Sequence, residues 1–243
     1  MGFKADCESA IEEIAKTPIK FRSGRVVPRT EDVALRDGGV LLNAAYLYAD
    51  MSDSTGLARN FSSFDAAIII RAYLSAVSMV IRHRGGEIRS FDGDRVMGIF
   101  VGDNAASVAA KAALNITWVV DQVVHNQLKA HVDEYFDVYR DGVWKLGHRT
   151  GIDVGWALVV RAGVRANNDL VSIGEAPNIA AKLSDFTGWR TNITQRTWDA
   201  IDHATLFSEQ DGLDRWVYPA RQVDLGGGLT EMVSGSNWKW AID

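Results

Sequence analysis

Residues 48–55 are Tyr48-Ala49-Asp50-Met51-Ser52-Asp53-Ser54-Thr55, and they end an apolar run that starts near Leu41. The run predicts a buried strand over residues 41–50, which ends on a carboxylate and passes into a loop of small polar residues. An acid at a strand end, followed by backbone N–H groups and hydroxyls, can hold a cation against a polyphosphate. This stretch therefore predicts a buried strand that ends in a candidate phosphate and metal site.

A second carboxylate lies in a predicted hairpin over residues 86–100. Two apolar segments flank Asp92-Gly93-Asp94, and Asp-Gly is a frequent signal for a tight hairpin turn. We expect Asp50 and Asp94 to lie on neighbouring strands and to share two divalent ions, as in many phosphoryl-transfer sites. Taken alone, each acid is better explained as a turn or helix-cap residue.

These two segments resemble the metal-binding strand and hairpin of the class III nucleotide cyclases. In that family the first metal aspartate lies in a Phe-Ala-Asp-Ile-x-x-x-Thr pattern and the second in a Gly-Asp-x-x-Met pattern. Gly151-Ile152-Asp153-Val154-Gly155 resembles a later family strand, and residues 171–182 resemble the helix that carries a transition-state Asn and, one turn later, an Arg. Four elements in the family's order, over residues 44–185, are far more specific than any one alone.

The resemblance implies an α/β fold, an α+β sandwich of the class III cyclase type. Its ferredoxin-like βαββαβ core has a central, mostly antiparallel sheet flanked by helices, and a C-terminal hairpin follows. Apolar periodicity in the sequence agrees with this order. It predicts helices over residues 64–84 and 105–130, two strands over 144–162, and a closing hairpin over 223–242. We expect residues 1–40 to be an N-terminal helical arm and connector, and residues 41–243 to be the catalytic domain.

The resemblance also gives each matched residue a role. Asp50, Asp94 and the Met51 carbonyl would hold two divalent ions, Mn²⁺ or Mg²⁺, which lower the pKa of the attacking hydroxyl and neutralise the leaving group. Asn178 would orient the ribose, and Lys182 would stabilise charge on the transferred phosphoryl. The side chain of Asp53 keeps the role of a helix cap. The phosphates would be bound by the backbone N–H groups of Ser52, Asp53, Ser54 and Thr55.

Two departures from the family pattern bear on the chemistry. Lys182 stands where Arg is usual, so a compact charge is kept while the planar fork of Arg is lost. Adenylate cyclases read the base with a Lys four residues before the second metal Asp and an Asp seven before the Asn. Those positions are Ser90 and Val171 here, and a shift of one residue brings in Arg89. The usual adenine readers are therefore absent, and so are the Glu and Cys of guanylate cyclases.

The short hairpin, Tyr48 in place of Phe, and the compact chain are similar to the pyrimidine cyclases of bacterial Pycsar anti-phage systems. This resemblance implies a uridylate cyclase, which converts UTP into 3′,5′-cyclic UMP and pyrophosphate as an alarm read by a separate effector. It also implies a head-to-tail homodimer in which Asp50 and Asp94 of one subunit face Asn178 and Lys182 of the other. No residue distinguishes UTP from CTP, so a cytidylate cyclase that makes cyclic CMP stays open.

Other classes of function stay open as well. One alternative is an adenylate or guanylate cyclase, and another is a catalytically dead nucleotide sensor, although both metal acids are retained. Gly85-Gly86-Glu87-Ile88 is similar to the signature of diguanylate cyclases, but here the Gly pair precedes the strand. A purely structural module is disfavoured, because two clustered strand-end acids cost stability unless an ion pairs them.

Composition narrows the partners of the chain. Its 243 residues carry 26 basic and 31 acidic side chains, a net charge of −5, which disfavours broad nucleic-acid binding. Cys7 is the single cysteine, so an intramolecular disulfide and a cysteine-built zinc site are excluded. The sequence shows no apolar run judged long enough to span a bilayer and no signal-peptide core over residues 1–6. We therefore expect a cytoplasmic protein with no membrane insertion.

Overall fold

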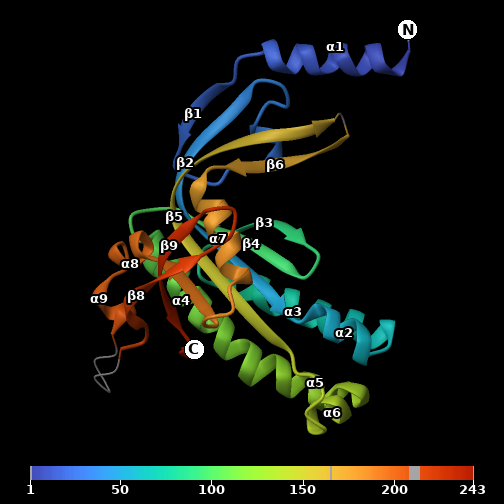
Figure 1. Ribbon diagram of the computed structural model, residues 1–243, viewed down its shortest axis with the longest axis vertical. Helices are drawn as coiled ribbons and strands as arrows, with labels where there is room; N and C mark the ends of the chain where they lie inside the picture. The colour runs from blue at the N-terminus through green and yellow to red at the C-terminus, as the bar shows by residue number, and fades with distance from the viewer. Residues whose placement is uncertain (1, 165, 208–213, 243) are drawn as a thin grey trace.

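One large sheet organises the residues that the computed structural model describes, which are 2–164, 166–207 and 214–242 (Figure 1). The strands in chain order are β1 (Lys20–Gly24), β2 (Gly38–Ser52), β3 (Glu87–Asp92), β4 (Arg95–Phe100), β5 (Gly147–Val164), β6 (Asn167–Ile173), β7 (Thr191–Thr194), β8 (Val217–Asp224) and β9 (Thr230–Ser236). The helices are α1 (Phe3–Lys16), α2 (Ser54–Asn60), α3 (Ser63–His83), α4 (Ala105–Val119), α5 (His125–His131), α6 (Asp133–Arg140), α7 (Glu175–Asp185), α8 (Gln195–Asp199) and α9 (His203–Leu206), with a 3₁₀ turn η1 (Thr30–Asp32) and a π-helical turn η2 (Val120–Val124).

The central part of the sheet has the expected ferredoxin-like topology. Its strands lie in the order β3-β4-β2-β5, and every neighbouring pair among them is antiparallel. Helix α3 connects β2 to β3, and α4 begins the connection from β4 to β5. Beyond β5 the sheet continues through β7 and β9 to β8. Strands β8 and β9 form the expected C-terminal hairpin, but over residues 217–236 rather than the predicted 223–242. The predicted fold class and the mostly antiparallel sheet are therefore confirmed.

Strand β2 separates two layers of core because its side chains alternate between the two faces of the sheet. Ala45, Leu47 and Ala49 are fully buried against α3 and α4. Ala44 and Tyr46 point to the other face, where they pack in a second cluster with residues of α7. Tyr48 and Asp50 follow Tyr46 on this second face by the same alternation. The acid at the strand end therefore faces the side of the sheet that α7 covers.

Helix α3 is held by an apolar face and by a capped N-terminus. Ile69, Tyr73 and Val77 recur at helical spacing in the main core, and Ser62 Oγ accepts a hydrogen bond from Asp65 N at 3.1 Å. By length and composition alone, α3 could cross a membrane, which corrects the expectation that no apolar run has this length. Core helices pass the same test, so one such helix is weak evidence for a span.

Three local expectations are corrected by the structure. Residues 147–164 form one long strand rather than two, because continuous pairing with β2 and with β6 holds both of its halves in the sheet. The helix predicted over residues 105–130 is interrupted by η2. The connector contains a strand, β1, which pairs in parallel with the start of β2.

The N-terminal arm lies at one end of the molecule, where helix α1 lies away from the sheet (Figure 1). No residue of α1 is buried, and an ion pair between Glu13 and Arg36 ties the helix to the segment before β2. Because β1 belongs to the sheet, the arm and the sheet are continuous at this point. The division of the chain at residues 40 and 41 stays a prediction.

Candidate active site

The two predicted metal acids lie close together, one near the end of β2 and the other in the turn before the neighbouring strand β4. Asp50 lies near the end of β2, and its partner in the β2–β4 register is Arg95. Asp94 precedes Arg95 in the two-residue turn between β3 and β4, where Gly93 adopts a φ of 62°. Residues other than glycine rarely adopt this backbone conformation, which explains the glycine at the tip of the turn. Antiparallel pairing thus brings together two carboxylates that are far apart in the sequence.

The surroundings of Asp50 disfavour its ionised form. Burial raises the pKa of Asp50 to about 6; the positive charge of Arg95 opposes this rise, while the carboxylates of Asp94 and Asp185 add to it. Nε of Arg95 lies 3.8 Å from Oδ1 of Asp50, which is too far for a hydrogen bond. One arginine therefore compensates only part of the negative charge that gathers here. A bound cation would stabilise the ionised carboxylates further.

The donor atoms at this site suit a hard divalent cation. Mg²⁺ and Mn²⁺ prefer carboxylate, carbonyl and water oxygens. Oδ2 of Asp94 is buried and has no hydrogen-bond partner among the described residues, which is costly unless another group pairs with it. Within the same residues, no group of three or more His, Cys, Asp and Glu side chains could hold a metal ion. The site therefore depends on two carboxylates, and the Met51 carbonyl stays a predicted further ligand.

The predicted phosphate loop forms the entry into α2. Ser52 is the last residue of β2, and Asp53 follows in the left-handed conformation with a φ of 58°. Oδ1 of Asp53 accepts a hydrogen bond from the backbone N–H of Gly56 at 3.0 Å, as the cap of a helix does. Ser54 and Thr55 form the first turn of α2. The cap role of Asp53 is confirmed, and phosphate binding by the backbone of residues 52–55 stays a prediction.

Helix α7 carries Asn178 and Lys182 on its exposed side. Its other side is buried against the sheet and contains Ala176, Ile179, Ala180 and Leu183. Gly151 on β5 permits this packing, because a Cβ there would meet the carbonyl oxygen of Ala180 at 2.1 Å. Nζ of Lys182 donates a hydrogen bond to the carbonyl of Leu225 at 2.8 Å, beside the turn between β8 and β9. The helix therefore presents its polar side outward on a closely fitted base.

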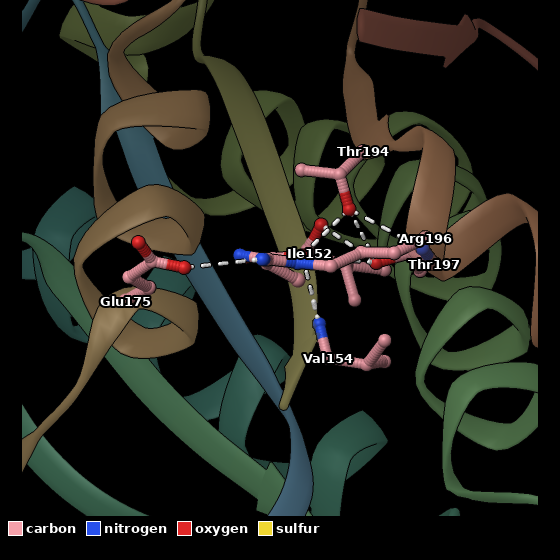
Figure 2. A network of polar contacts seen from close by, with 7 residues as sticks. Ile152, Val154, Glu175, Thr194, Arg196 and Thr197 are labelled. Atoms are coloured by element: carbon pink, nitrogen blue, oxygen red, sulfur yellow. Dashed lines mark hydrogen bonds and ion pairs between the residues drawn. The ribbon is translucent and has the colours of Figure 1, made fainter. Parts of the chain in front are cut away.

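An ion pair between a half-buried arginine and a buried carboxylate supports the N-terminal end of α7 (Figure 2). Asp153 is fully buried on β5 and accepts hydrogen bonds from Nε of Arg196 at 2.8 Å and from Oγ1 of Thr194 at 2.6 Å. Nη2 of Arg196 also pairs with Asp153, and Nη1 reaches Oε2 of Glu175, the first residue of α7, at 3.4 Å. No local motif in the sequence predicts this network, because Asp153 and Arg196 are 43 positions apart.

One predicted base position lies in a row that crosses three strands. Ser90 on β3 and Tyr48 on β2 are both register partners of Met97 on β4. The Tyr48 hydroxyl lies 3.1 Å from Sδ of Met97, and Oγ of Ser90 lies 3.7 Å from the same sulfur. Burial raises the pKa of Tyr48, so its hydroxyl is protonated near neutral pH. This row is two residues from Asp50 along β2, on the same face of the sheet.

The other two base positions are associated with β6. Arg89 lies in the bulge between Ile88 and Ser90, and its Nη2 is 3.5 Å from Oδ1 of Asp169 on β6. Val171 is an exposed residue of β6. The structure therefore places Arg89 beside the strand that carries Val171. A role for either residue in reading the base stays a prediction.

The structure does not join the two halves of the predicted catalytic set directly. Among the described residues, no hydrogen bond or ion pair links Asn178 or Lys182 to Asp50 or Asp94. Helix α7 instead approaches the acids through Asp185, its last residue, whose Oδ1 lies 3.6 Å from Nη2 of Arg95. Asp185 was not among the predicted site residues.

Comparison with known proteins identifies relatives of the chain, although no protein-family model matches it. It is 40% identical to a uridylate cyclase of Rhodovulum sp. (strain MB263) over 185 residues, and this aligned stretch covers 76% of this chain and 75% of the relative. It is 30% identical to a uridylate cyclase of Xanthomonas perforans over 100% of both chains. The chain belongs to the uridylate cyclase family. A further uridylate cyclase, from Burkholderia cepacia, is 33% identical over 89% of both chains.

Solved structures place this uridylate cyclase family member among the class III nucleotide cyclases by fold. The guanylyl cyclase Cya2 superposes with a TM-score of 0.64 at 20% identity, over 81% of this chain and 92% of that one. The adenylyl cyclase CyaB from P. aeruginosa superposes with a TM-score of 0.56 at 20% identity, over 81% and 94% of the two chains. Identities this low establish the shared fold alone, and the resemblance to class III cyclases is confirmed.

Proposed function

We propose that this chain converts UTP into 3′,5′-cyclic UMP and pyrophosphate. The observation that carries the proposal is the pair of acids in this chain, Asp50 near the end of β2 and Asp94 in the adjacent β3–β4 turn. Three relatives named uridylate cyclase, 30% to 40% identical to the chain, support UTP as the substrate. Purified protein incubated with UTP and Mn²⁺ should release pyrophosphate and cyclic UMP in equal amounts.

In the proposed reaction, the 3′-oxygen of the substrate attacks its own α-phosphorus. A bond forms between these atoms, the bond from the α-phosphorus to the bridging oxygen of the β-phosphate breaks, and the hydroxyl proton is lost. Asp50 and Asp94 would hold divalent ions, Mn²⁺ or Mg²⁺, together with the Met51 carbonyl. When bound, such ions supply Lewis-acid activation of the hydroxyl and neutralise the leaving pyrophosphate. The backbone of residues 52–55 would bind the phosphates.

The exposed side of α7 supplies the remaining groups in this proposal. Asn178 orients the ribose, so that the 3′-hydroxyl stays aligned with the phosphorus. Lys182 stabilises the negative charge on the transferred phosphoryl as a compact ammonium. Its hydrogen bond to the Leu225 carbonyl would hold the ammonium near the β8–β9 turn until substrate binds.

We also propose that the active site is shared between two chains of a homodimer, with the acids of one subunit facing α7 of the other. The absence of direct contacts between Asn178 or Lys182 and the acids, within the described part of one chain, supports this arrangement. Mixing Asp50→Ala chains with Asn178→Ala chains should restore activity, because one site of each mixed dimer escapes both changes. No recovery under conditions of subunit exchange would exclude a shared site.

Base selection has a test of its own. Ser90 lies beside Tyr48 in the row that ends near Asp50, while Arg89 and Val171 lie toward β6. A competition among UTP, CTP, ATP and GTP should yield cyclic UMP predominantly. A pocket whose polar groups hydrogen-bond one base leaves some of these groups without a partner when a different base is bound. Predominant cyclic CMP would favour the cytidylate alternative, and efficient use of ATP or GTP would exclude pyrimidine selection.

Finally, we propose a signalling role in the cytoplasm, where UTP is available. Similarity to the pyrimidine cyclases of anti-phage defence supports a cyclic nucleotide that a separate effector reads. Cells that express the wild-type chain should accumulate cyclic UMP after phage infection, and cells with Asp94→Ala should not. Equal cyclic UMP in infected and uninfected cells would argue against infection as the trigger.

A further inference from the structure

Arg95 joins the acid pair to the end of α7. Its Nε lies 3.8 Å from Oδ1 of Asp50, and its Nη2 lies 3.6 Å from Oδ1 of Asp185. The arginine side chain is 24% exposed and that of Asp50 is 19% exposed, whereas Asp185 is 58% exposed. One guanidinium therefore has an inner carboxylate partner at the predicted metal site and an outer partner at the surface.

Neither contact of Arg95 is a full hydrogen bond, because both distances exceed the usual donor–acceptor range. Nε of Arg95 is buried without a hydrogen-bond partner in the described chain, and so is Oδ2 of Asp94. Buried polar groups in this condition are unfavourable and gain from any rearrangement that pairs them. The arginine is thus held between two carboxylates by charge rather than by a closed hydrogen-bonded geometry.

Arg95 and a divalent cation compete for the same inner carboxylate. The positive charges of the guanidinium and of a metal ion on Asp50 repel each other, and the metal ion takes the carboxylate oxygens that face Arg95, so metal binding favours withdrawal of the guanidinium. Asp185 lies on the more exposed side of the same guanidinium. It can therefore form an ion pair with Arg95 after the arginine leaves Asp50, so that the arginine side chain stays at the site. Asp185 itself belongs to no group of three or more residues that could hold a metal, among those described.

We propose that Arg95 is the resident counter-ion of the metal site, which a divalent ion displaces from Asp50, and that Asp185 is the anchor that receives the displaced guanidinium. Both are positioning residues. The proposal depends on the proposed function, because it takes Asp50 and Asp94 as the metal ligands. The proposal explains why an arginine lies beside the acids of a metal site. The positive charge of Arg95 offsets part of the negative charge of the carboxylates until a metal ion binds.

The test is Mn²⁺ binding to nucleotide-free protein, with free Mn²⁺ measured from its electron paramagnetic resonance signal. Arg95→Gln should raise the affinity about two- to five-fold, the range expected when one partly exposed charge is removed. Asp185→Asn should lower it by about the same factor, because Arg95 then pairs more fully with Asp50. Arg95→Lys keeps the charge and should stay close to wild type. Circular dichroism and thermal unfolding check that each variant is folded.

The double variant separates the anchor from a general effect of charge. If Asp185 acts mainly through Arg95, then Asp185→Asn should lower the affinity much less in the Arg95→Gln background than in the wild type, where only its direct effect on Asp50 remains. A ligand, or a carboxylate that acts only through its field, lowers the affinity equally in both backgrounds, and that result would overturn the proposal. Asp92→Asn is the matched control, since Asp92 is the β3 register partner of Arg95 and should give the same small change in both backgrounds.

Two further outcomes distinguish failure of this inference from failure of the metal assignment. Asp94→Asn should abolish the Mn²⁺ binding of the wild type. If it leaves binding unchanged, the acids are not the metal ligands and the inference fails with them. If Asp94→Asn abolishes binding but Arg95→Gln leaves the wild-type affinity unchanged, the metal site is correct and the role of Arg95 is refuted.

Discussion

Gly151→Ala should slow the reaction by displacing the helix that carries Asn178 and Lys182. A Cβ at this position would lie 2.1 Å from the carbonyl oxygen of Ala180 and 2.5 Å from the backbone nitrogen of Ser184, whereas ordinary contact begins at 3.4 Å. Both atoms belong to the backbone of α7, so no side-chain rotation relieves the clash. The helix must move outward by about 1 Å, a displacement that can cost about 100-fold in rate when it misplaces a reacting group.

The assay for Gly151→Ala combines steady-state cyclic UMP formation with thermal unfolding. Overpacking costs about 1–3 kcal/mol, which corresponds to a fall of roughly 2–12 °C in Tm for a chain of this length. We expect kcat to fall about 100-fold, by the displacement argument above. Gly98→Ala is the control, because its Cβ would meet the flexible Ile81 side chain of α3 at 3.0 Å on the opposite face. A wild-type rate in Gly151→Ala, or equal losses in both variants, would refute the reasoning.

Three other predictions follow from the site. Asp50→Ala and Asp94→Ala should each abolish cyclic nucleotide formation with an unchanged circular dichroism spectrum, and activity in either folded variant would contradict the metal assignment. Burial raises the pKa of Asp50 to about 6, so the stability that its neutral form contributes is fully present below its ordinary pKa and is lost as the pH rises through about 6. Asp50→Asn should therefore raise the Tm of metal-free protein near neutral pH but not in acid, while Mn²⁺ binding by the wild type weakens below about pH 6. Asp153→Asn removes the charge of the buried acceptor that Arg196 and Thr194 bond and leaves Glu175 as the remaining counter-ion of Arg196. It should cost about 1.5–3 kcal/mol in urea unfolding, the range for hydrogen bonds to a charged group, whereas a loss below about 1 kcal/mol would contradict a structural role for the pair.

The parts of the site that local patterns encode were predictable from the sequence. The apolar run before Asp50 and the Asp-Gly signal before Asp94 each specify a strand end or a turn within a few residues. Register then follows from antiparallel pairing, which places Arg95 opposite Asp50. Helix α7 was also expected, because residues 171–182 resemble the family helix that carries the transition-state Asn.

Features that depend on distant partners were not predictable in this way. The Asp153–Arg196 pair and the Arg95–Asp185 contact join elements that are separate in sequence, so neither leaves a local pattern. Strand β1 was missed for a different reason. Four of its five residues are exposed, so it lacks the apolar alternation by which strands are recognised.

The way α7 meets the sheet has a consequence for how such enzymes diversify. Its inner residues touch the sheet closely over Gly151, while Glu175, Asn178, Lys182 and Asp185 project outward in a stripe at helical spacing. The outer residues are under little steric constraint from the core, so mutation can replace them one at a time while the fold persists. The departure of Lys182 from the usual arginine is a change of this kind. The inner residues of α7 can therefore stay fixed by packing while substitutions in the outer residues change the chemistry of the site.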